Sequence, residues 1–263
     1  MPKAPAAAEP RKSFNGAAEI YHGIRPGYPP PVFDDLFQLW PGRPAVLEVG
    51  PGTGQATRDL LSRGATVHAV EIGPALAAKL REVLPSSALT ITVGDFEEAD
   101  VAEHSFAAVF SATGYHWISP KAQVDRPASV LKPGGVVAIV DLIQVSSPDD
   151  KGFFAAAQPV YERYGEGHTG PQAPERDAVD PPIRLVLGGD PRFSNVEVRS
   201  YDWDQTYSAA DYRKLMLSYS STQMMTPAAR QGLLDDIEKF VRQQFGNQVT
   251  RPIVVTLTTA RLT

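Results

Sequence analysis

The sequence predicts an α/β protein built on a doubly wound, mostly parallel sheet. Short apolar stretches alternate with stretches of helical character over residues 45–142. The stretch 106–111 is apolar on both faces, which is typical of a buried parallel strand. Strands that alternate with helices at this spacing indicate parallel neighbours joined by right-handed crossovers.

The elements follow each other in a regular order. Two helices, over 14–22 and 32–40, flank the rigid turn Arg25-Pro26-Gly27-Tyr28-Pro29-Pro30-Pro31 and precede a first strand that ends at Val49. Two breakers mark helix boundaries further along the chain: Gly73-Pro74 opens a helix, and Lys132-Pro133-Gly134-Gly135 ends one. Further strands are expected over 65–72, 89–93, 106–111 and 136–142, and helices over 55–62, over 74–84 and up to about 131.

The character of the chain changes after Ser146. Residues 147–192 are rich in proline, glycine and charge, and a segment of this length between sheet elements is either a lid or partly disordered. Its aromatic residues would give a lid an apolar underside, or would pack the core of a capping helix: Phe153, Phe154, Tyr161 and Tyr164. Two closing strands, 196–203 and 253–260, are expected with helices over 209–218 and 227–245 between them. We therefore expect a disordered leader (1–13), a cofactor-binding core with leader helices (14–146), a lid or substrate insertion (147–192) and a strand–helix–strand completion of the core (193–263).

Composition excludes several classes of function. The net charge of −5 and the pI of about 5.6 argue against nucleic acid as a partner, because phosphate binding depends on clustered Lys and Arg. No apolar run approaches 18 residues and residues 1–10 lack an apolar signal core, so we expect no membrane partner and a cytoplasmic location. The absence of cysteine excludes a thiolate nucleophile, a cysteine–zinc site and an iron–sulfur cluster. The sequence does not indicate an oligomeric state.

The most informative motif is the glycine loop after the first strand. Gly50, Gly52 and Gly54 alternate with other residues, which gives G-x-G-x-G, and Gln55 stands where a dinucleotide fingerprint would have its third glycine. Glu48 lies two residues before the loop. A carboxylate there would repel a pyrophosphate and attract an ammonium group. The loop therefore predicts a nucleoside cofactor with a cationic end, which describes S-adenosylmethionine (SAM).

Four segments together resemble the class I SAM-dependent methyltransferases, in particular the small-molecule branch of trans-aconitate methyltransferase-like proteins. The resemblance covers about residues 14–145 closely and the C-terminal part loosely, and it implies a seven-stranded, mostly parallel Rossmann-like sheet with an antiparallel C-terminal strand and a lid insertion. The segments are Glu48-Val49-Gly50-Pro51-Gly52-Thr53-Gly54, Val70-Glu71-Ile72, Gly94-Asp95-Phe96 and Leu131-Lys132-Pro133-Gly134-Gly135.

The resemblance implies a role for each matching residue. Glu48 and the Gly50, Gly52 and Gly54 loop would hold the methionine portion of SAM, and Glu71 would accept from both ribose hydroxyls. The rest of the cofactor site would come from residues after the other strands and in the leader: Ile72 and Phe96 beside the adenine ring, Asp95 on its amino group, Ser111 at the methionine end through its backbone, and Tyr21 and Arg25 at the methionine carboxylate or over the cleft.

The segment after the fourth strand is the candidate for catalysis. Methyl transfer needs alignment and exclusion of water, and a base only when the acceptor must lose a proton. His116 is the histidine best placed to act, as a base or as a residue that orients the substrate; the alternative is that His116 and Trp117 only pack the start of a helix. Aromatic faces near the methyl group can favour the sulfonium cation, and four residues could supply them: Tyr21, Tyr28, Tyr115 and Trp117. No cluster of carboxylates for magnesium is visible, so no metal is expected.

The leading hypothesis is therefore SAM-dependent methyl transfer to a small organic molecule, at oxygen or carbon in preference. A nicotinamide-dependent oxidoreductase is the second hypothesis, since an acid such as Glu71 about 20 residues beyond the glycines also suits that class. A non-catalytic regulatory protein that binds SAM is the third. RNA methylation is a weaker fourth, because of the acidic charge.

Overall fold

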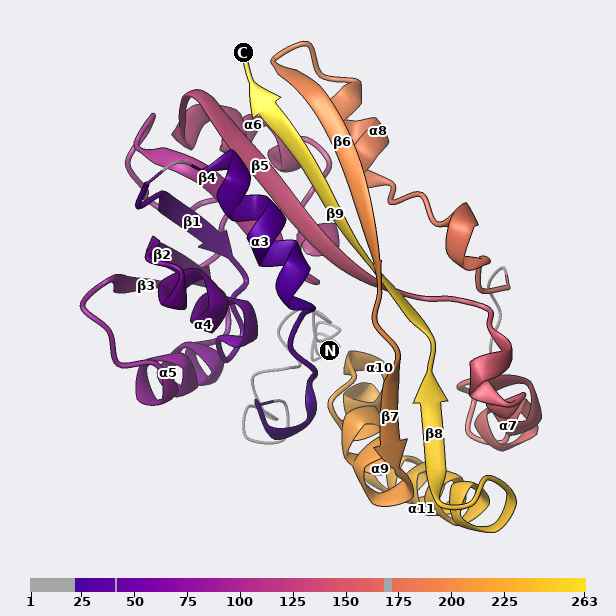
Figure 1. Cartoon of the computed structure of the whole chain (residues 1–263). Coiled ribbons are helices and arrows are strands. Elements are labelled where there is room, and N and C mark those ends of the chain that lie inside the picture. Colours follow the sequence, from indigo (N-terminus) through magenta and orange to yellow (C-terminus); the bar gives the residue numbers. More distant parts are fainter. Residues whose placement is uncertain (1–21, 41, 168–171) are drawn as a thin grey trace, which may run out of the picture. The chain divides into compact units, whose positions relative to one another are not determined.

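The computed structural model describes residues 22–40, 42–167 and 172–263 (Figure 1). The chain divides into two compact units. The first, which we call the sheet unit, comprises residues 26–148, 172–205 and 251–263. The second, the helical unit, takes in the described residues of 22–25, 149–167 and 206–250.

The sheet unit is built on seven strands in the order β3-β2-β1-β4-β5-β9-β6 (Figure 1). Neighbours from β3 to β5 pair in parallel, whereas β9 pairs antiparallel with both β5 and β6. The predicted fold class, a mostly parallel sheet with an antiparallel C-terminal strand, is confirmed. The strands are β1 (Ala45–Val49), β2 (Thr66–Glu71), β3 (Leu89–Val93), β4 (Phe106–Ala112), β5 (Leu131–Gln144), β6 (Phe193–Asp202) and β9 (Ile253–Leu262).

Helices cover both faces of this sheet because each central strand is apolar on both sides. On β4, Ala108 and Phe110 belong to one core cluster while Val109 between them belongs to the other. The first cluster is completed by α3 (Pro30–Leu39), α4 (Gln55–Ser62) and α5 (Pro74–Val83), and the second by α6 (Ala122–Val130) and α8 (Ile183–Gly188). This is the doubly wound arrangement. Three 3₁₀ turns join the longer elements: η2 (Tyr115–Trp117), η3 (Pro148–Asp150) and η4 (Arg176–Ala178).

The strand β5 begins five residues earlier than the sequence indicates. The breaker Lys132-Pro133-Gly134-Gly135 was expected to separate a helix from a strand over 136–142, but α6 already ends at Val130 and Leu131 pairs with Phe106. A register shift between Phe106 and Ala108 accommodates the breaker inside the paired region. The prediction of the helix end near 131 is correct, and the strand start is wrong.

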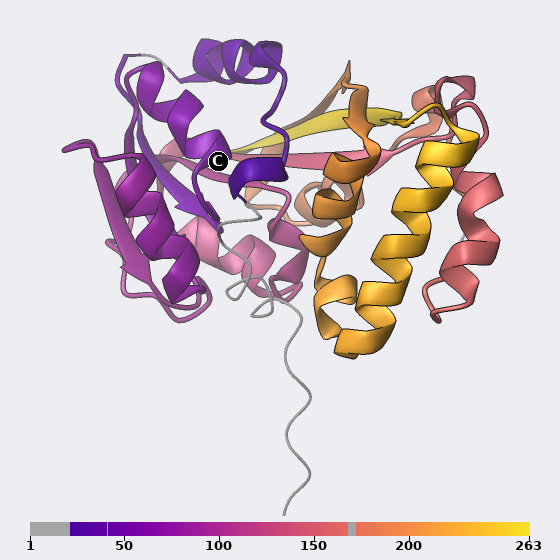
Figure 2. The ribbon, with the colours of Figure 1, turned by 90° about the horizontal axis from the view of Figure 1, so that it is seen from below.

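The helical unit has a core of its own. Phe153 is fully buried among the rings of Phe154, Tyr212 and Phe245, whose centroids lie 5.0 to 5.3 Å from its own. In Figure 2, α11 runs between α9 and α7, and contacts join α11 to both. The helices are α7 (Phe153–Glu162), α9 (Ala209–Leu217), α10 (Ser220–Met224) and α11 (Pro227–Gln244). The aromatic residues predicted for the underside of a lid therefore pack into this core.

A second sheet of two strands, β7 (Gln205–Ser208) and β8 (Gln248–Arg251), was not predicted. Neither strand shows a sustained apolar alternation, so the pattern carries no strand signal. The segment 147–192 is shared between the units, because residues 149–167 fall in the helical unit and residues 172–192 in the sheet unit. Its role as a lid stays a prediction. The expected leader (1–13) and almost all of the helix expected over 14–22 lie outside the described residues.

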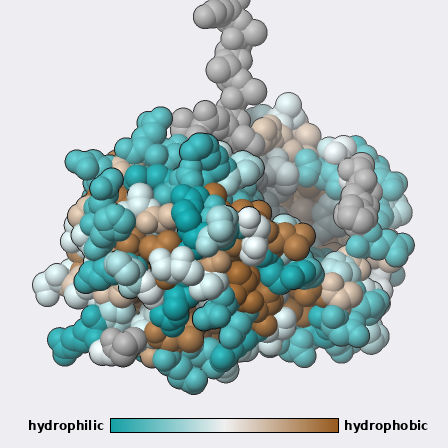
Figure 3. Space-filling view, turned by 90° about the horizontal axis from the view of Figure 1, so that it is seen from above, coloured by the Kyte–Doolittle hydropathy of each residue, from teal (hydrophilic) through white to brown (hydrophobic). Residues whose placement is uncertain are grey.

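The surface of the described residues is mostly hydrophilic. Apolar side chains show between hydrophilic ones on the face in Figure 3. Four large apolar side chains are exposed among the described residues, namely Val93, Trp117, Leu185 and Met224. Isolated exposures of this kind are normal and need no partner to explain them. Of the helices that the structure describes, none has both the length and the apolar composition needed to span a bilayer.

Candidate functional site

The glycine loop joins β1 to α4 and takes a conformation that requires glycine. Gly50, Gly52 and Gly54 all have positive φ, at 66°, 60° and 95°. Gly50 N donates to the carbonyl of Val70 on β2 at 2.9 Å, which fastens the loop to the neighbouring strand. A Cβ on Gly50 would meet nothing within 4 Å, so the open side of the loop has room for a ligand to approach the backbone.

Gly54 is also required because a side chain at this position would clash with its neighbours, which gives a prediction for the stability of the fold. A Cβ at this position would lie 2.6 Å from Leu80 Cδ1 and 2.7 Å from Leu84 Cδ1. We expect Gly54→Ala to lower the free energy of unfolding by about 2 kcal/mol or more, from the strained φ together with the clash. Chemical denaturation measures this. Gly188→Ala, at the open end of α8, is the control and should be neutral or slightly stabilising; equal losses in both variants would contradict the assignment.

Glu71 closes the loop from β2. Its side chain is 3% exposed, Gly52 N donates to Oε2 at 2.9 Å, and Gly73 N donates to Oε1 at 2.8 Å. Burial raises the pKa of this carboxyl, while the backbone N–H groups oppose the rise. Each carboxylate oxygen has a second lone pair, so Glu71 can accept from two further donors. The predicted pairing with two hydroxyls is chemically available.

Glu48 is enclosed in the fold beside the glycine loop. The side chain is 1% exposed, and its Oε2 accepts from the Thr57 hydroxyl at 2.7 Å. Burial raises the pKa of Glu48 to about 8, which favours the neutral form in the ligand-free protein at neutral pH. A neutral acid neither repels a pyrophosphate nor attracts an ammonium group, so the sequence argument requires that a bound cofactor ionises Glu48. Its charge and its contact with the cofactor stay predictions.

The end of β4 lies against the glycine loop. Ser111 is fully buried and donates to the carbonyl of Val49 at 2.8 Å, so its hydroxyl is already used; the contact of its backbone with a ligand stays a prediction. A Cβ on Gly114 would be 3.9 Å from the Gly50 carbonyl oxygen. Thr113 between them has a φ of +59° and shares a hydrogen bond of 3.2 Å with the Tyr28 hydroxyl. Sequence reasoning missed Thr113, since no motif marks a β-branched residue in the left-handed region.

The turn η2 carries the predicted catalytic histidine. Tyr115 is 1% exposed and its hydroxyl donates to the Gln123 carbonyl at 2.7 Å, so the expectation that its ring faces the methyl group is wrong. His116 is exposed and packs on Trp117 with 4.8 Å between ring centroids. Partial burial lowers the pKa of His116, so its imidazole is neutral at physiological pH and can accept a proton.

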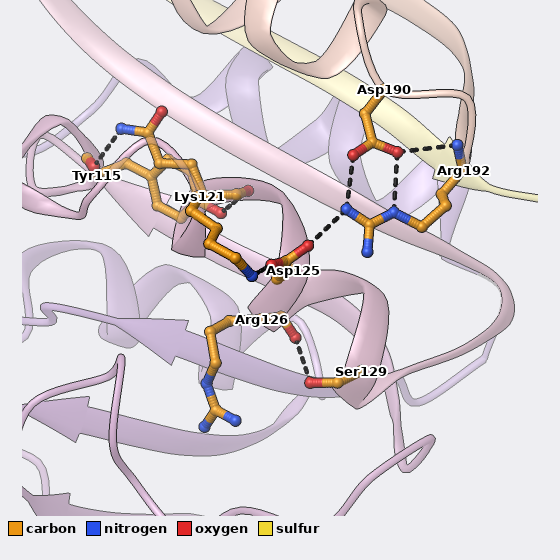
Figure 4. A network of polar contacts seen from close by, with 8 residues as sticks. Tyr115, Lys121, Asp125, Arg126, Ser129, Asp190 and Arg192 are labelled. Carbon is orange, nitrogen blue, oxygen red and sulfur yellow. Dashed lines mark hydrogen bonds and ion pairs between the residues drawn. The ribbon is translucent and has the colours of Figure 1, made fainter.

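The helix α6, which supports this turn, is tied to the loop before β6. Figure 4 shows Arg192 between Asp190 and Asp125, with nitrogen–oxygen distances of 2.6 and 2.7 Å, and Lys121 paired with Asp125. The Arg192 guanidinium lowers the pKa of Asp190 to about 2. Such exposed pairs add little stability one by one, but a network of charges fixes the position of α6.

Three predicted adenine contacts follow β2 and β3. Ile72 is half-buried and belongs to none of the core clusters among the described residues, which leaves its side chain available. Asp95 Oδ1 accepts from Glu97 N at 3.1 Å and the side chain is half-exposed. Phe96 is only 4% exposed and sits in the core with the Arg126 guanidinium 5.5 Å from its ring centroid. Contact of Phe96 with a nucleobase stays a prediction and is limited to that small exposed area.

The described part of the sheet unit does not include two of the predicted residues. Tyr21 lies outside the described residues. Arg25 belongs to the helical unit, where its NH2 donates to the Ser218 carbonyl at 3.0 Å and its guanidinium lies 4.7 Å from the Tyr219 ring centroid. The described residues contain no group of three or more metal-ligating side chains.

The chain is similar in sequence to methyltransferases. Residues 47–139 match the family described as methyltransferase domain. An uncharacterized methyltransferase of Mycobacterium tuberculosis (strain H37Rv) is 37% identical over 128 residues, which are 49% of this chain and 51% of the relative. The ribosomal RNA small subunit methyltransferase A of Mycobacterium bovis (strain BCG) is 46% identical over 68 residues, or 26% of this chain and 16% of that protein. The chain thus spans about half the length of the first of these relatives.

Solved structures share the fold. Phosphoethanolamine N-methyltransferase 2 of Haemonchus contortus, in complex with SAM, superposes with a TM-score of 0.56 at 18% identity and covers 100% of this chain and 61% of that chain. The YcgJ protein of Bacillus subtilis gives a TM-score of 0.53 at 13% identity, over 88% of this chain and 97% of that chain. Residues 47–139 are thus similar to methyltransferase domains, and the chain shares the fold of these solved proteins, one of which binds SAM.

The residues of the loop fit this cofactor. Gln55 begins α4, and its Oε1 accepts from the Thr53 hydroxyl at 3.2 Å, whereas its buried Nε2 has no partner among the described residues. A buried donor without an acceptor is costly and indicates a missing ligand atom. The carboxylate of the methionine portion is an acceptor of the right kind. Together with the open side of Gly50 and the spare lone pairs of Glu71, this makes a site of suitable chemistry.

Proposed function

We propose that this protein is a SAM-dependent methyltransferase that acts on a small organic acceptor, at oxygen or carbon in preference, and leaves S-adenosylhomocysteine. The observation that carries this proposal is the glycine loop held at the carboxyl end of β1 by the Glu71 carboxylate. Ligands of open α/β sheets bind at that edge. The likeness to the trans-aconitate methyltransferase-like branch, and a cytoplasmic location, belong to the proposal.

Each predicted residue has a part in it. The cofactor supplies a methyl group on a sulfonium. The loop of Gly50, Gly52 and Gly54 binds the methionine portion with the Ser111 backbone beside it, and Glu71 accepts from the ribose hydroxyls. Ile72, Asp95 and Phe96 orient the adenine, Glu48 holds the methionine portion together with the loop, and Arg25 and Tyr21 act at the methionine carboxylate or over the cleft.

Calorimetric titration separates the proposal from its main alternative. S-adenosylhomocysteine should bind and NADH should give no heat, because Gln55 replaces the third glycine that a dinucleotide needs. The reverse result would favour a nicotinamide-dependent oxidoreductase. A protein that binds S-adenosylhomocysteine but forms no methylated product from a broad metabolite panel would be a regulatory SAM-binding protein.

We expect His116→Asn to lower turnover at least tenfold and to leave the affinity for S-adenosylhomocysteine within twofold, since general-base catalysis contributes on the order of 10²–10⁴-fold. Because the pKa of His116 is lowered, wild-type activity should fall only below about pH 6.5, where the imidazole gains its proton. The matched control is His104→Asn, whose φ of +46° suits asparagine. A fully active His116→Asn variant would remove this residue from the mechanism.

Methylation of RNA is the second candidate, and the identity to a ribosomal RNA methyltransferase favours it. That identity covers only 68 residues, or 26% of this chain. The net charge of −5 opposes it. Tight RNA binding that weakens steeply with salt would support this candidate over a small-molecule acceptor.

A further inference from the structure

An acidic residue that the motifs do not cover stands at the carboxyl edge of the sheet. The Val140 carbonyl on β5 accepts from Thr113 N, just past the end of β4, at 2.8 Å. Asp141 is the next residue along β5. Side chains alternate along a strand, so Asp141 shares a face with Ile139, which packs in the same core cluster as Tyr115 and Ile118. Asp141 therefore lies on the face that carries the η2 turn of His116.

The Asp141 carboxyl is isolated among the described residues. No hydrogen bond or ion pair of the side chain occurs within the part of the chain that the structure describes, and burial alone raises the pKa of this carboxyl. The residue is half-buried, so a ligand can still reach it. Taking a carboxyl out of water without a partner costs free energy, and such groups are concentrated at functional sites.

The neighbouring strand β9 adds two buried hydroxyls. Thr256 is the direct cross-strand partner of Asp141, and Thr258 is the partner of Ile139. Both threonines are fully buried, and neither hydroxyl has a hydrogen-bond partner among the described residues. Direct cross-strand neighbours have Cβ atoms roughly 4.5–5.5 Å apart, within reach of a hydroxyl–carboxylate hydrogen bond. The two side chains share no hydrogen bond in the described structure, but a rotation of either one would let the enclosed Thr256 orient the Asp141 carboxyl towards a ligand.

We propose that Asp141 binds the methyl acceptor by accepting a hydrogen bond from a hydroxyl or amine group of that molecule, with Thr256 orienting the carboxyl. This inference rests on the proposed function and names its substrate class. Two or three carboxylates on an acceptor would be repelled by Asp141 at this edge and could not donate to it. The acceptor is thus a small alcohol, phenol or amine, and differs from the tricarboxylate after which the related branch is named.

Ligand-detected NMR on the protein loaded with S-adenosylhomocysteine tests this choice. The probes are catechol and ethanolamine, which carry donors, and trans-aconitate and malonate, which do not at neutral pH. We expect the wild type to bind catechol, ethanolamine or both, and to bind neither carboxylate. Preferred binding of a carboxylate, or no binding of either donor probe, would overturn the inference.

Substitutions at position 141 make the test specific to this residue. Asp141→Leu keeps the approximate shape without an acceptor and should weaken binding of the donor probe at least tenfold, with the affinity for S-adenosylhomocysteine within twofold. Asp141→Ala, which also lacks an acceptor, decides the question if the leucine variant does not fold. Glu197→Gln, an exposed carboxyl on β6 of the same sheet, is the control. Unchanged probe binding in the folded Asp141 variant would overturn the inference, whereas failure of the wild type to bind S-adenosylhomocysteine would overturn the proposed function itself.

The positioning role of Thr256 has its own readout. Thr256→Val removes the hydroxyl and keeps the shape, so a purely structural role predicts equal or higher stability and unchanged binding of the probe. We expect probe binding about threefold or more weaker, restored by Thr256→Ser. Unchanged binding in Thr256→Val would show that Asp141 needs no orientation from β9.

Discussion

Glu71→Ala is expected to weaken the binding of S-adenosylhomocysteine by about 1 to 3 kcal/mol, or roughly fivefold to 150-fold. Two effects add up. The hydrogen bonds that Glu71 would accept from the ribose hydroxyls disappear, and Gly52 N and Gly73 N lose the acceptor that holds the glycine loop in its conformation. Isothermal titration calorimetry at pH 7.5 measures the change.

A nearby carboxyl that plays no part in the loop provides the control. Glu82→Ala on α5 removes an exposed carboxyl that pairs with Lys79 at 3.0 Å, and should leave the affinity within twofold. Glu71→Gln separates the two effects, because the amide oxygen still accepts one backbone N–H while the charge is lost. If Glu71→Ala binds S-adenosylhomocysteine as well as the wild type, neither the ribose contact nor the bracing of the loop by Glu71 contributes to binding.

Much of the sheet can be predicted from the sequence because the strands there are nearly continuous apolar runs between glycine and proline breakers. Val46–Val49 before the glycines and Phe106–Ser111 are of this kind, and both were placed correctly. The strands β7 and β8 show where prediction of the fold from the sequence fails. Those two strands are polar and short, and they form because the chain brings Gln205–Ser208 beside Gln248–Arg251, which no local pattern encodes.

The candidate site also has some features that the sequence predicts and others that it does not. The glycines can be found from their spacing, since positive φ at alternate positions restricts the residue type. The protonation state of Glu48 cannot be found from the sequence, because it depends on how completely the fold encloses the side chain. Asp141 could have been noticed as the acid within an apolar run over 136–142, but its isolation depends on which residues β4 and β9 place around it. Sequence supplies the residue types, and the pairing of distant strands supplies their environment.

The enclosure of Glu48 has a consequence for stability that depends on pH. The carboxyl has an ordinary pKa of 4.5 in the unfolded chain and about 8 in the folded protein, so the folded state binds the proton more tightly. The loss of folding stability that follows from ionising buried Glu48 is absent below about pH 4.5, grows as the pH rises towards 8 and is complete above it. At high pH this loss of stability reaches about 5 kcal/mol, because each unit of difference in pKa corresponds to about 1.36 kcal/mol. Burial also raises the pKa of Glu71 and Asp141, so their contributions have the same sign.

Glu48→Gln isolates the part that belongs to Glu48. The amide resembles the protonated acid and still offers an oxygen to the Thr57 hydroxyl, so the variant should unfold at higher denaturant concentration than the wild type at pH 8.5 and should lose this advantage at pH 5. Denaturation curves at both values measure the difference. Because Glu48 is neutral and enclosed, the affinity for S-adenosylhomocysteine at pH 7 should change less than threefold. A tenfold loss would show instead that the cofactor's ammonium group draws the proton off Glu48, and that the carboxylate charge inferred from the sequence is restored when the site is filled.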